Sequence, residues 1–181
     1  MPAANAVQMA QPPDYLTLAR NRDRAGQREA PFRRALVVLV GLVCLAGLLN
    51  AFGQHPETSE AATPDASLKV YAASRVRGGL YYEARMTVTA RRDVENATLV
   101  LEPGWAEGIT INTVEPSPVG EASRDGNLVF ELGHIPARTS YILFLHLQVN
   151  PTNIGHRSQD VALYDGDRFL TKVDRSVTVF P

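Results

Sequence analysis

The stretch LYYEARMTVT, residues 80–89, decides the fold class of this chain. Every second position from Leu80 to Val88 is apolar, and the positions between them hold Tyr81, Glu83, Arg85, Thr87 and Thr89. Because successive side chains of a β-strand point to opposite faces, this period of two predicts a strand with one buried face.

The same alternation recurs on both sides of this stretch. Turn signals separate the segments, most clearly Arg124-Asp125-Gly126-Asn127 and Asp165-Gly166-Asp167. Together the segments predict an all-β, immunoglobulin-like antiparallel β-sandwich of about 7–8 strands over residues 67–181. The other expected strands lie at 68–73, 97–101, 109–111, 128–132, 141–149, 161–163 and 169–180.

Residues 141–149 are apolar on both faces, because Ile142 and Phe144 stand between the apolar positions of the first face. Two interpretations remain open. The segment is either a central strand buried on both sides, or it exposes Ile142 and Phe144 as a docking patch.

A second pattern precedes the strands, the uncharged run ALVVLVGLVCLAGLLNAF at residues 35–52. As a helix it would cover about 27 Å, close to the hydrocarbon thickness of a bilayer. It therefore predicts a single transmembrane helix ahead of the sandwich. Residues 53–66 are polar and carry two prolines, which predicts a linker.

Residues 1–34 contain six arginines, and Arg33 and Arg34 directly precede the apolar run. Residues 53–66 have no lysine or arginine. Since positive charge beside a span stays in the cytoplasm, we expect a basic cytoplasmic tail at 1–34. We expect this tail to be largely disordered, or to form a short frayed helix around residues 15–24. The sandwich is then extracytoplasmic, held at the plasma membrane.

Two alternatives to a membrane span exist. A cleaved signal peptide would use Ala51-Phe52-Gly53 as its processing site, but its apolar core is usually shorter and its basic region briefer. A lipoprotein anchor at Cys44 would need a small residue before the cysteine, where Val43 stands. We favour the span, with Cys44 as an apolar filler.

Composition limits the function further. The 181 residues carry a net charge of −1 with a pI of about 6.4, which excludes an overall basic field for nucleic acid. The single cysteine excludes an intrachain disulfide, so the sandwich must depend on its hydrophobic core.

No motif for catalysis is recognisable. His55, His134, His146 and His156 lack the spacing of a zinc site, and Asp165-Gly166-Asp167 fits a hairpin better than a calcium loop. No nucleophile elbow or phosphate loop is present in the sequence. We expect no metal, no cofactor and no enzymatic activity.

Candidate contact residues are of two kinds. Tyr81, Glu83 and Arg85 share the polar face of residues 80–89, and a mixture of tyrosine and arginine suits a protein contact as well as a solvated surface. Trp105 lies in a turn, where it either covers one end of the core or is an exposed contact or membrane-surface anchor.

Residues 88–149 also carry a family pattern: NATLVL at 96–101, PG at 103–104, ITI at 109–111, LVFELGHI at 128–135 and ARTS at 137–140. This order resembles the bacterial immunoglobulin-like repeat domains of cell surfaces, whose function is unknown. The resemblance implies a spacer or interaction module without catalytic residues.

These features predict a single-pass, non-catalytic accessory or interaction module. Its partners would be the lipid bilayer and a membrane protein or envelope component just outside the membrane. The alternative is an extracytoplasmic ligand-sensing domain that signals through the helix to the basic tail. A concave apolar pocket would favour this alternative.

Overall fold

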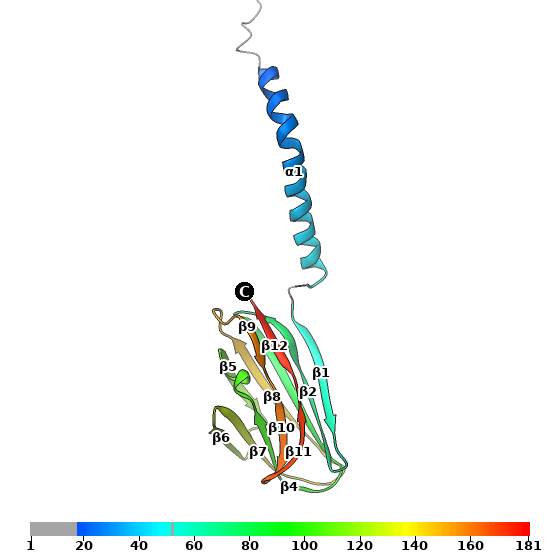
Figure 1. Ribbon diagram of the computed structural model, residues 1–181. Helices are drawn as coiled ribbons and strands as arrows, with labels where there is room; N and C mark the ends of the chain where they lie inside the picture. The colour runs from blue at the N-terminus through cyan, green and yellow to red at the C-terminus, as the bar shows by residue number, and fades with distance from the viewer. Residues whose placement is uncertain (1–17, 52) are drawn as a thin grey trace, which may run out of the picture. The chain divides into compact units, whose positions relative to one another are not determined.

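A computed structural model describes residues 18–51 and 53–181, with side chains in the helix described from residue 31 onward. The chain divides into two compact units, one ending at Leu49 and the other running from Asn50 to Pro181. The first unit contains helix α1 (Leu18–Leu48), and the second is a β-sandwich (Figure 1).

Helix α1 is longer than the predicted span. It includes residues 18–34, so this part of the tail is helical where the sequence predicted disorder or a short frayed helix, and Pro31 lies inside the helix. Residues 1–17 lie outside the described part. The helix ends at Leu48, and Asn50 adopts a left-handed conformation (φ 57°), which is common just beyond a helix C-terminus.

Residues 31–48 form the one described helix that is long and apolar enough to cross a membrane, with a mean hydropathy of 1.8. None of these residues is buried within the protein, and leucines and valines are exposed around the whole circumference. A helix that is apolar all round and uncovered by protein is compatible with single-pass anchoring. A signal sequence near the N-terminus has the same length and composition.

The sandwich consists of two facing sheets (Figure 1). The seven-stranded sheet has the order β5-β8-β3-β2-β12-β9, with β1 also paired to β2, and the five-stranded sheet has the order β11-β10-β4-β7-β6. The predicted all-β sandwich preceded by one helix is confirmed. The strands are β1 (His55–Ala62), β2 (Ala66–Arg77), β3 (Tyr81–Ala90), β4 (Val94–Leu101), β5 (Ile109–Glu115), β6 (Gly120–Arg124), β7 (Asn127–Ile135), β8 (Ser140–Val149), β9 (Gly155–Ser158), β10 (Val161–Asp165), β11 (Arg168–Val173) and β12 (Ser176–Phe180).

The core lies between the inner faces of the two sheets. In β3 the predicted alternation holds from Tyr82 onward, with Tyr82, Ala84, Met86 and Val88 all buried. Leu80 departs from it, because it lies in the turn before β3 and is 39% exposed. The inner face of β8 is equally apolar, and four of its residues are buried: Leu143, Leu145, Leu147 and Val149.

Strand β8 is central, between β5 and β3, as one interpretation of its sequence required. It is not buried on both sides, because Ile142 is 41% exposed and Phe144 is half-buried on the outer face. Burial of one face alone is the usual arrangement in an antiparallel sandwich.

The predicted linker at 53–66 is wrong, because most of it forms strand β1. β1 pairs antiparallel with β2 from His55↔Arg75 to Ala62↔Ser67. Its residues are mostly exposed, so it is held by backbone hydrogen bonds and leaves no apolar period in the sequence. Pro56 is tolerated because one edge of β1 has no described strand partner.

Two predicted turns are tight hairpins. Arg124 pairs with Asn127, and Asp125 and Gly126 both have positive φ (51° and 82°), as a type I′ turn requires. Asp165 pairs with Arg168 around Gly166 and Asp167. Beyond this second hairpin, the single strand predicted at 169–180 is two strands, β11 and β12, in different sheets.

The two faces of β8 predict different costs of truncation. Leu145→Ala should lower the free energy of unfolding by about 2–5 kcal/mol, because it leaves a cavity between the sheets. Ile142→Ala on the same strand should cost less than about 1 kcal/mol, since Ile142 is 41% exposed and its truncation leaves no enclosed cavity. Urea denaturation of the full chain in detergent measures both. Equal losses would contradict the assigned faces.

Candidate interaction face

The predicted contact residues of β3 and β8 meet on the outer face of the seven-stranded sheet. Arg85 pairs with Phe144, and Thr87 pairs with Ile142. Glu83 pairs with His146 and Tyr81 with Gln148 further along the same two strands. Because paired residues share a face, five of the six candidates (Tyr81, Glu83, Arg85, Ile142 and Phe144) form one surface.

One cross-strand row runs through this surface. Tyr71 of β2, Arg85 of β3, Phe144 of β8 and Glu115 of β5 occupy successive paired positions. The Arg85 guanidinium carbon lies 5.2 Å from the centre of the Tyr71 ring, within cation–π range. We call this row and its neighbours Tyr81, Glu83 and Ile142 the outer face. Tyr71 and Glu115 could not be assigned to this face from the sequence, because their position depends on which strands pair.

The chemistry of the outer face suits a protein contact. It combines tyrosine, phenylalanine and arginine, the residue types enriched where proteins bind one another. Tyr81 is 66% exposed and Ile142 41% exposed, so a partner would bury substantial apolar area. The stacking on Tyr71 orients Arg85, which lowers the entropy cost of using its guanidinium in an interface.

Trp105, the sixth candidate, is not a surface contact. It lies in the 3-10 turn η2 (Pro103–Trp105) and is fully buried in the core. Its indole Nε1 donates to the carbonyl oxygen of Gln159 at 2.9 Å, and the Arg175 guanidinium carbon lies 4.9 Å from its ring centre. Trp105 therefore covers one end of the core, and the prediction of a surface contact is wrong for this residue.

A buried polar network surrounds Trp105. Gln159 is fully buried, accepts from Arg175 Nη1 at 2.9 Å and donates from Nε2 to the Gly104 carbonyl at 3.3 Å. Arg175 Nη2 also donates to the Ala73 carbonyl at 3.1 Å. Burial lowers the pKa of Arg175 and raises the pKa of the neighbouring Tyr82. The polar groups of this network form hydrogen bonds with one another and with backbone carbonyls, which gives the network a structural role.

A charged cluster lies beside this network. Lys172 Nζ contacts Asp160 Oδ2 and lies 3.2 Å from Glu102 Oε1, while the backbone N–H of Arg175 donates to Asp160 Oδ1 at 2.9 Å. Burial acts to raise the pKa of Asp160, but the hydrogen bonds from Lys172 and Arg175 outweigh it and lower that pKa below its ordinary value of 3.8. The two carboxylates raise the pKa of Lys172.

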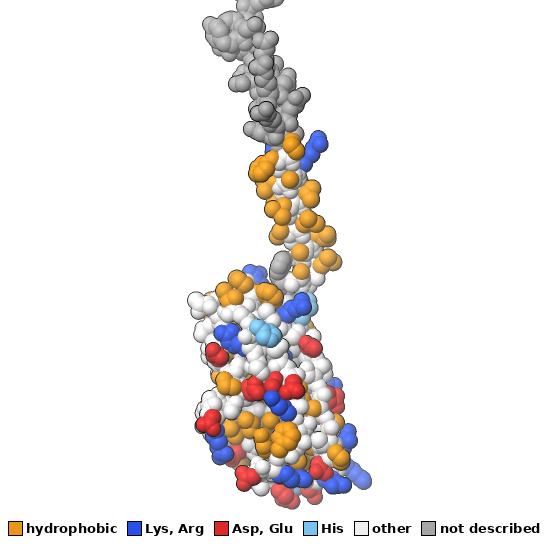
Figure 2. Space-filling model, in the orientation of Figure 1, with side chains coloured by type: hydrophobic (Ala, Val, Ile, Leu, Met, Phe, Trp, Pro, Cys, Tyr) orange, Lys and Arg blue, Asp and Glu red, His pale blue; other side chains and the backbone are white. Residues whose placement is uncertain are grey.

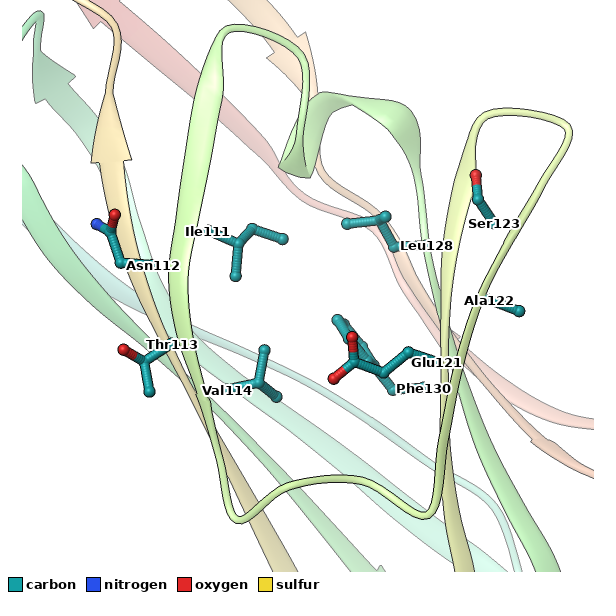
Figure 3. A pocket seen from close by; sticks show the side chains of 9 residues that line it. All are labelled: Ile111, Asn112, Thr113, Val114, Glu121, Ala122, Ser123, Leu128 and Phe130. Carbon is teal, nitrogen blue, oxygen red and sulfur yellow. The ribbon is translucent and has the colours of Figure 1, made fainter.

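An open cleft separates two outer strands of the sandwich (Figure 3). Its volume is about 640 Å³, and it lies between β5 of one sheet and β6 of the other. Ile111 and Val114 point into it from β5, toward Leu128, Phe130 and the carboxylate of Glu121. The sequence did not predict this cleft, because it depends on which strands end each sheet.

The histidines are dispersed. His55 Nδ1 lies 2.9 Å from the Gly53 carbonyl, and His156 Nδ1 lies 3.2 Å from Thr178 Oγ1. His134 on β7 and His156 on β9 belong to different sheets. Across residues 18–51 and 53–181, no group of three or more histidine, cysteine, aspartate or glutamate side chains is placed to hold a metal ion.

Comparison with known proteins adds little beyond the fold. No family model and no curated protein matches the sequence. Similar solved structures include the RrgA Jo.In complex, with 11% identity and a TM-score of 0.48 over 67% of this chain and 83% of that one.

Two further structures are less similar. The GH20 exo-β-N-acetylglucosaminidase from Vibrio harveyi, in complex with N-acetylglucosamine, is 13% identical with a TM-score of 0.35, over 65% of this chain and 18% of that one. The yeast delta-COP-I mu-homology domain is 11% identical with a TM-score of 0.33, over 64% and 55%. With TM-scores below 0.5, none of the three carries an argument about function. The resemblance to bacterial surface domains therefore holds only as a β-sandwich.

The charged cluster predicts a pH-dependent contribution to stability. Because folding lowers the pKa of Asp160, its contribution is present above about pH 4 and is lost as the pH falls through the folded-state pKa. Asp160→Asn should therefore cost about 1 kcal/mol at pH 7, where solvent partly screens the pair, and much less near pH 2.5.

Urea denaturation of the full chain in detergent at both pH values measures this difference. Asp174→Asn is the matched control, because Asp174 lies 3.4 Å from the same ammonium but is largely exposed. A cost for Asp160→Asn that is the same at both pH values would refute the assignment.

Proposed function

We propose that this chain is a single-pass membrane protein whose extracytoplasmic sandwich is a non-catalytic module that binds a membrane-protein or envelope partner. The uncovered apolar helix at 31–48 supports the anchor. Arg33 and Arg34, at the start of this segment and directly before its uncharged part, support a cytoplasmic N-terminus, because positive charge flanking a span is retained there.

The outer face is the observation that most strongly supports a role in binding a partner. Tyr71, Arg85 and Phe144 lie side by side on three neighbouring strands, and tyrosine, arginine and phenylalanine are the residue types enriched in protein interfaces. The position on regular strands gives these side chains a rigid base. A preformed surface of this kind binds without the entropy cost of loop ordering.

The absence of enzymatic activity is part of this proposal. In the described residues the fully buried Gln159 and the half-buried Arg175 form internal hydrogen bonds with each other and with the backbone. A catalytic centre instead needs a nucleophile or metal next to a base and open to substrate.

A second candidate function is ligand sensing, and the β5–β6 cleft favours it. Apolar side chains line the cleft floor, and Glu121 contributes a carboxylate that projects into it. A small or extended ligand with an apolar body and one positive charge would match these groups. The cleft is open along one side of the sandwich, which suits a weakly held ligand.

The proposed topology predicts a specific labelling pattern. In a Cys44→Ala background, Glu95→Cys should react with a membrane-impermeant maleimide in intact cells, because Glu95 is exposed on the sandwich. Ala6→Cys, in the basic tail, should react only after permeabilisation. The intact mass should still include the helix. The reverse pattern would refute the proposed orientation, and a mass lacking the residues before the sandwich would refute the anchor.

The outer face predicts a position-dependent photo-crosslink in native membranes. A benzoylphenylalanine at Phe144 should give a discrete adduct, and Arg85→Glu should reduce its yield severalfold by removing the oriented cation. The same probe at Phe169, which is exposed on the other sheet, is the matched control.

A probe at Ser123, in the cleft, distinguishes the two functions. Adducts from Phe144 but not from Ser123 support the interaction face. Adducts from Ser123 alone, insensitive to Arg85→Glu, would favour ligand binding in the cleft. Equal yields from Phe144 and Phe169 would refute a specific face.

A further inference from the structure

One end of the sandwich gathers four segments that are distant in sequence. Gly78 N donates to the Phe180 carbonyl at 2.8 Å, and Gly79 N donates to the Val149 carbonyl at 2.9 Å. Gln54 Nε2 donates to the Tyr81 carbonyl at 2.9 Å. The turn at 77–81, the turn at 150–154, the end of β12 and the residues before β1 therefore share this end, which we call the turn end.

The turn end exposes large apolar side chains. Leu80 is 39% exposed, Tyr81 66% and Ile154 55%. Gly79 adopts a positive φ (80°), a conformation that lets the chain turn sharply between β2 and β3, where Leu80 lies. Figure 2 shows hydrophobic side chains gathered at the end of the sandwich where Figure 1 marks the chain terminus C.

Basic groups surround these apolar residues. Arg75 and Arg77 are exposed at the end of β2, and Arg77 Nε donates to the Pro181 carbonyl at 3.2 Å. Glu107, beside the turn at 150–154, lies 3.9 Å from Arg157. Leucine, isoleucine and tyrosine with a rim of arginine match the boundary between lipid headgroups and acyl chains.

The opposite end of the sandwich has different chemistry. Its turns carry Asp65, which forms ion pairs with Arg92 and Arg168, both at 3.0 Å. Asp93 Oδ1 accepts from the backbone N–H of Ala137 at 2.7 Å. Phe169 is exposed beside Arg168 at this end, but the paired charges around it make burial at a hydrocarbon boundary costly.

The short connection between the helix and the sandwich indicates which surface the turn end contacts. Only residues 49–53 separate Leu48, the last helical residue, from Gln54, which bonds to the turn end. A stretch of this length spans about 20 Å at most. A bilayer crossed by the helix is therefore within reach of this end and of its exposed apolar side chains.

We propose that the turn end is a membrane-surface site, in which Leu80 and Ile154 insert into the headgroup layer of the bilayer that the helix crosses, while Tyr81 lies at the border with the outer face. This inference rests on the proposed single-pass anchor. It adds a second, peripheral contact that restricts how the sandwich is presented to a partner. The occupant is phospholipid, and Arg75 and Arg77 contact its phosphate groups.

Spin-label accessibility in nanodiscs tests this site. In the full chain with Cys44→Ala, a nitroxide at Ile154→Cys should collide severalfold less with water-soluble nickel chelate than one at Val119→Cys. Val119 is 78% exposed in the loop between β5 and β6, so it reports free solvent. Leu80→Ser should return the label at 154 to the accessibility of the control.

The same chain in amphipol, without a bilayer, separates lipid from protein contact. Protection at 154 that disappears in amphipol supports the site, whereas protection that persists shows contact with protein and overturns it. Equal accessibility at 154 and 119 in chains that remain in nanodiscs also overturns it and leaves the anchor intact. A chain that does not enter nanodiscs refutes the anchor and this inference together.

Discussion

The structure depends on the burial of one face of β3 and β8 against the five-stranded sheet. The inner residues of these paired strands, among them Met86, Leu143 and Leu145, are fully buried. No disulfide supports the sandwich, because the single cysteine lies in the helix. Hydrophobic burial must therefore offset most of the entropy lost on folding. The outer face can carry functional side chains because the inner face supplies the stability.

The sequence predicted the elements whose burial is periodic. Residues 80–89 and 141–149 alternate between core and surface, so their hydrophobic pattern records which face is buried. Strands held mainly by backbone pairing were missed. β1, β6 and β9 are mostly exposed, and an exposed strand needs no apolar period. The linker prediction failed for this reason, since polarity alone does not distinguish a surface strand from a flexible segment.

The candidate site was predicted in part. Tyr81, Glu83 and Arg85 were placed on one face by strand period alone, but their adjacency to Phe144 and Tyr71 depends on strand order. For Trp105 the sequence did not predict the observed burial. Its turn position left a surface role open, whereas the carbonyl of Gln159 and the guanidinium of Arg175 provide the polar partners that allow full burial. Partners so far away in sequence leave no local signal.

The parallel pairing of β12 with β2 has a consequence for how the domain reaches its native state. Thr178 lies opposite Arg75, so this closure joins parts of the chain about a hundred residues apart, and β9 attaches to the sheet through β12. Contacts of such long range form late and slow the search for the native topology. Until residues 176–180 are available, the edge of β2 beside Val76 remains unpaired there and open to pairing with another chain. A cell that makes this protein must therefore keep the incomplete sheet from associating with itself.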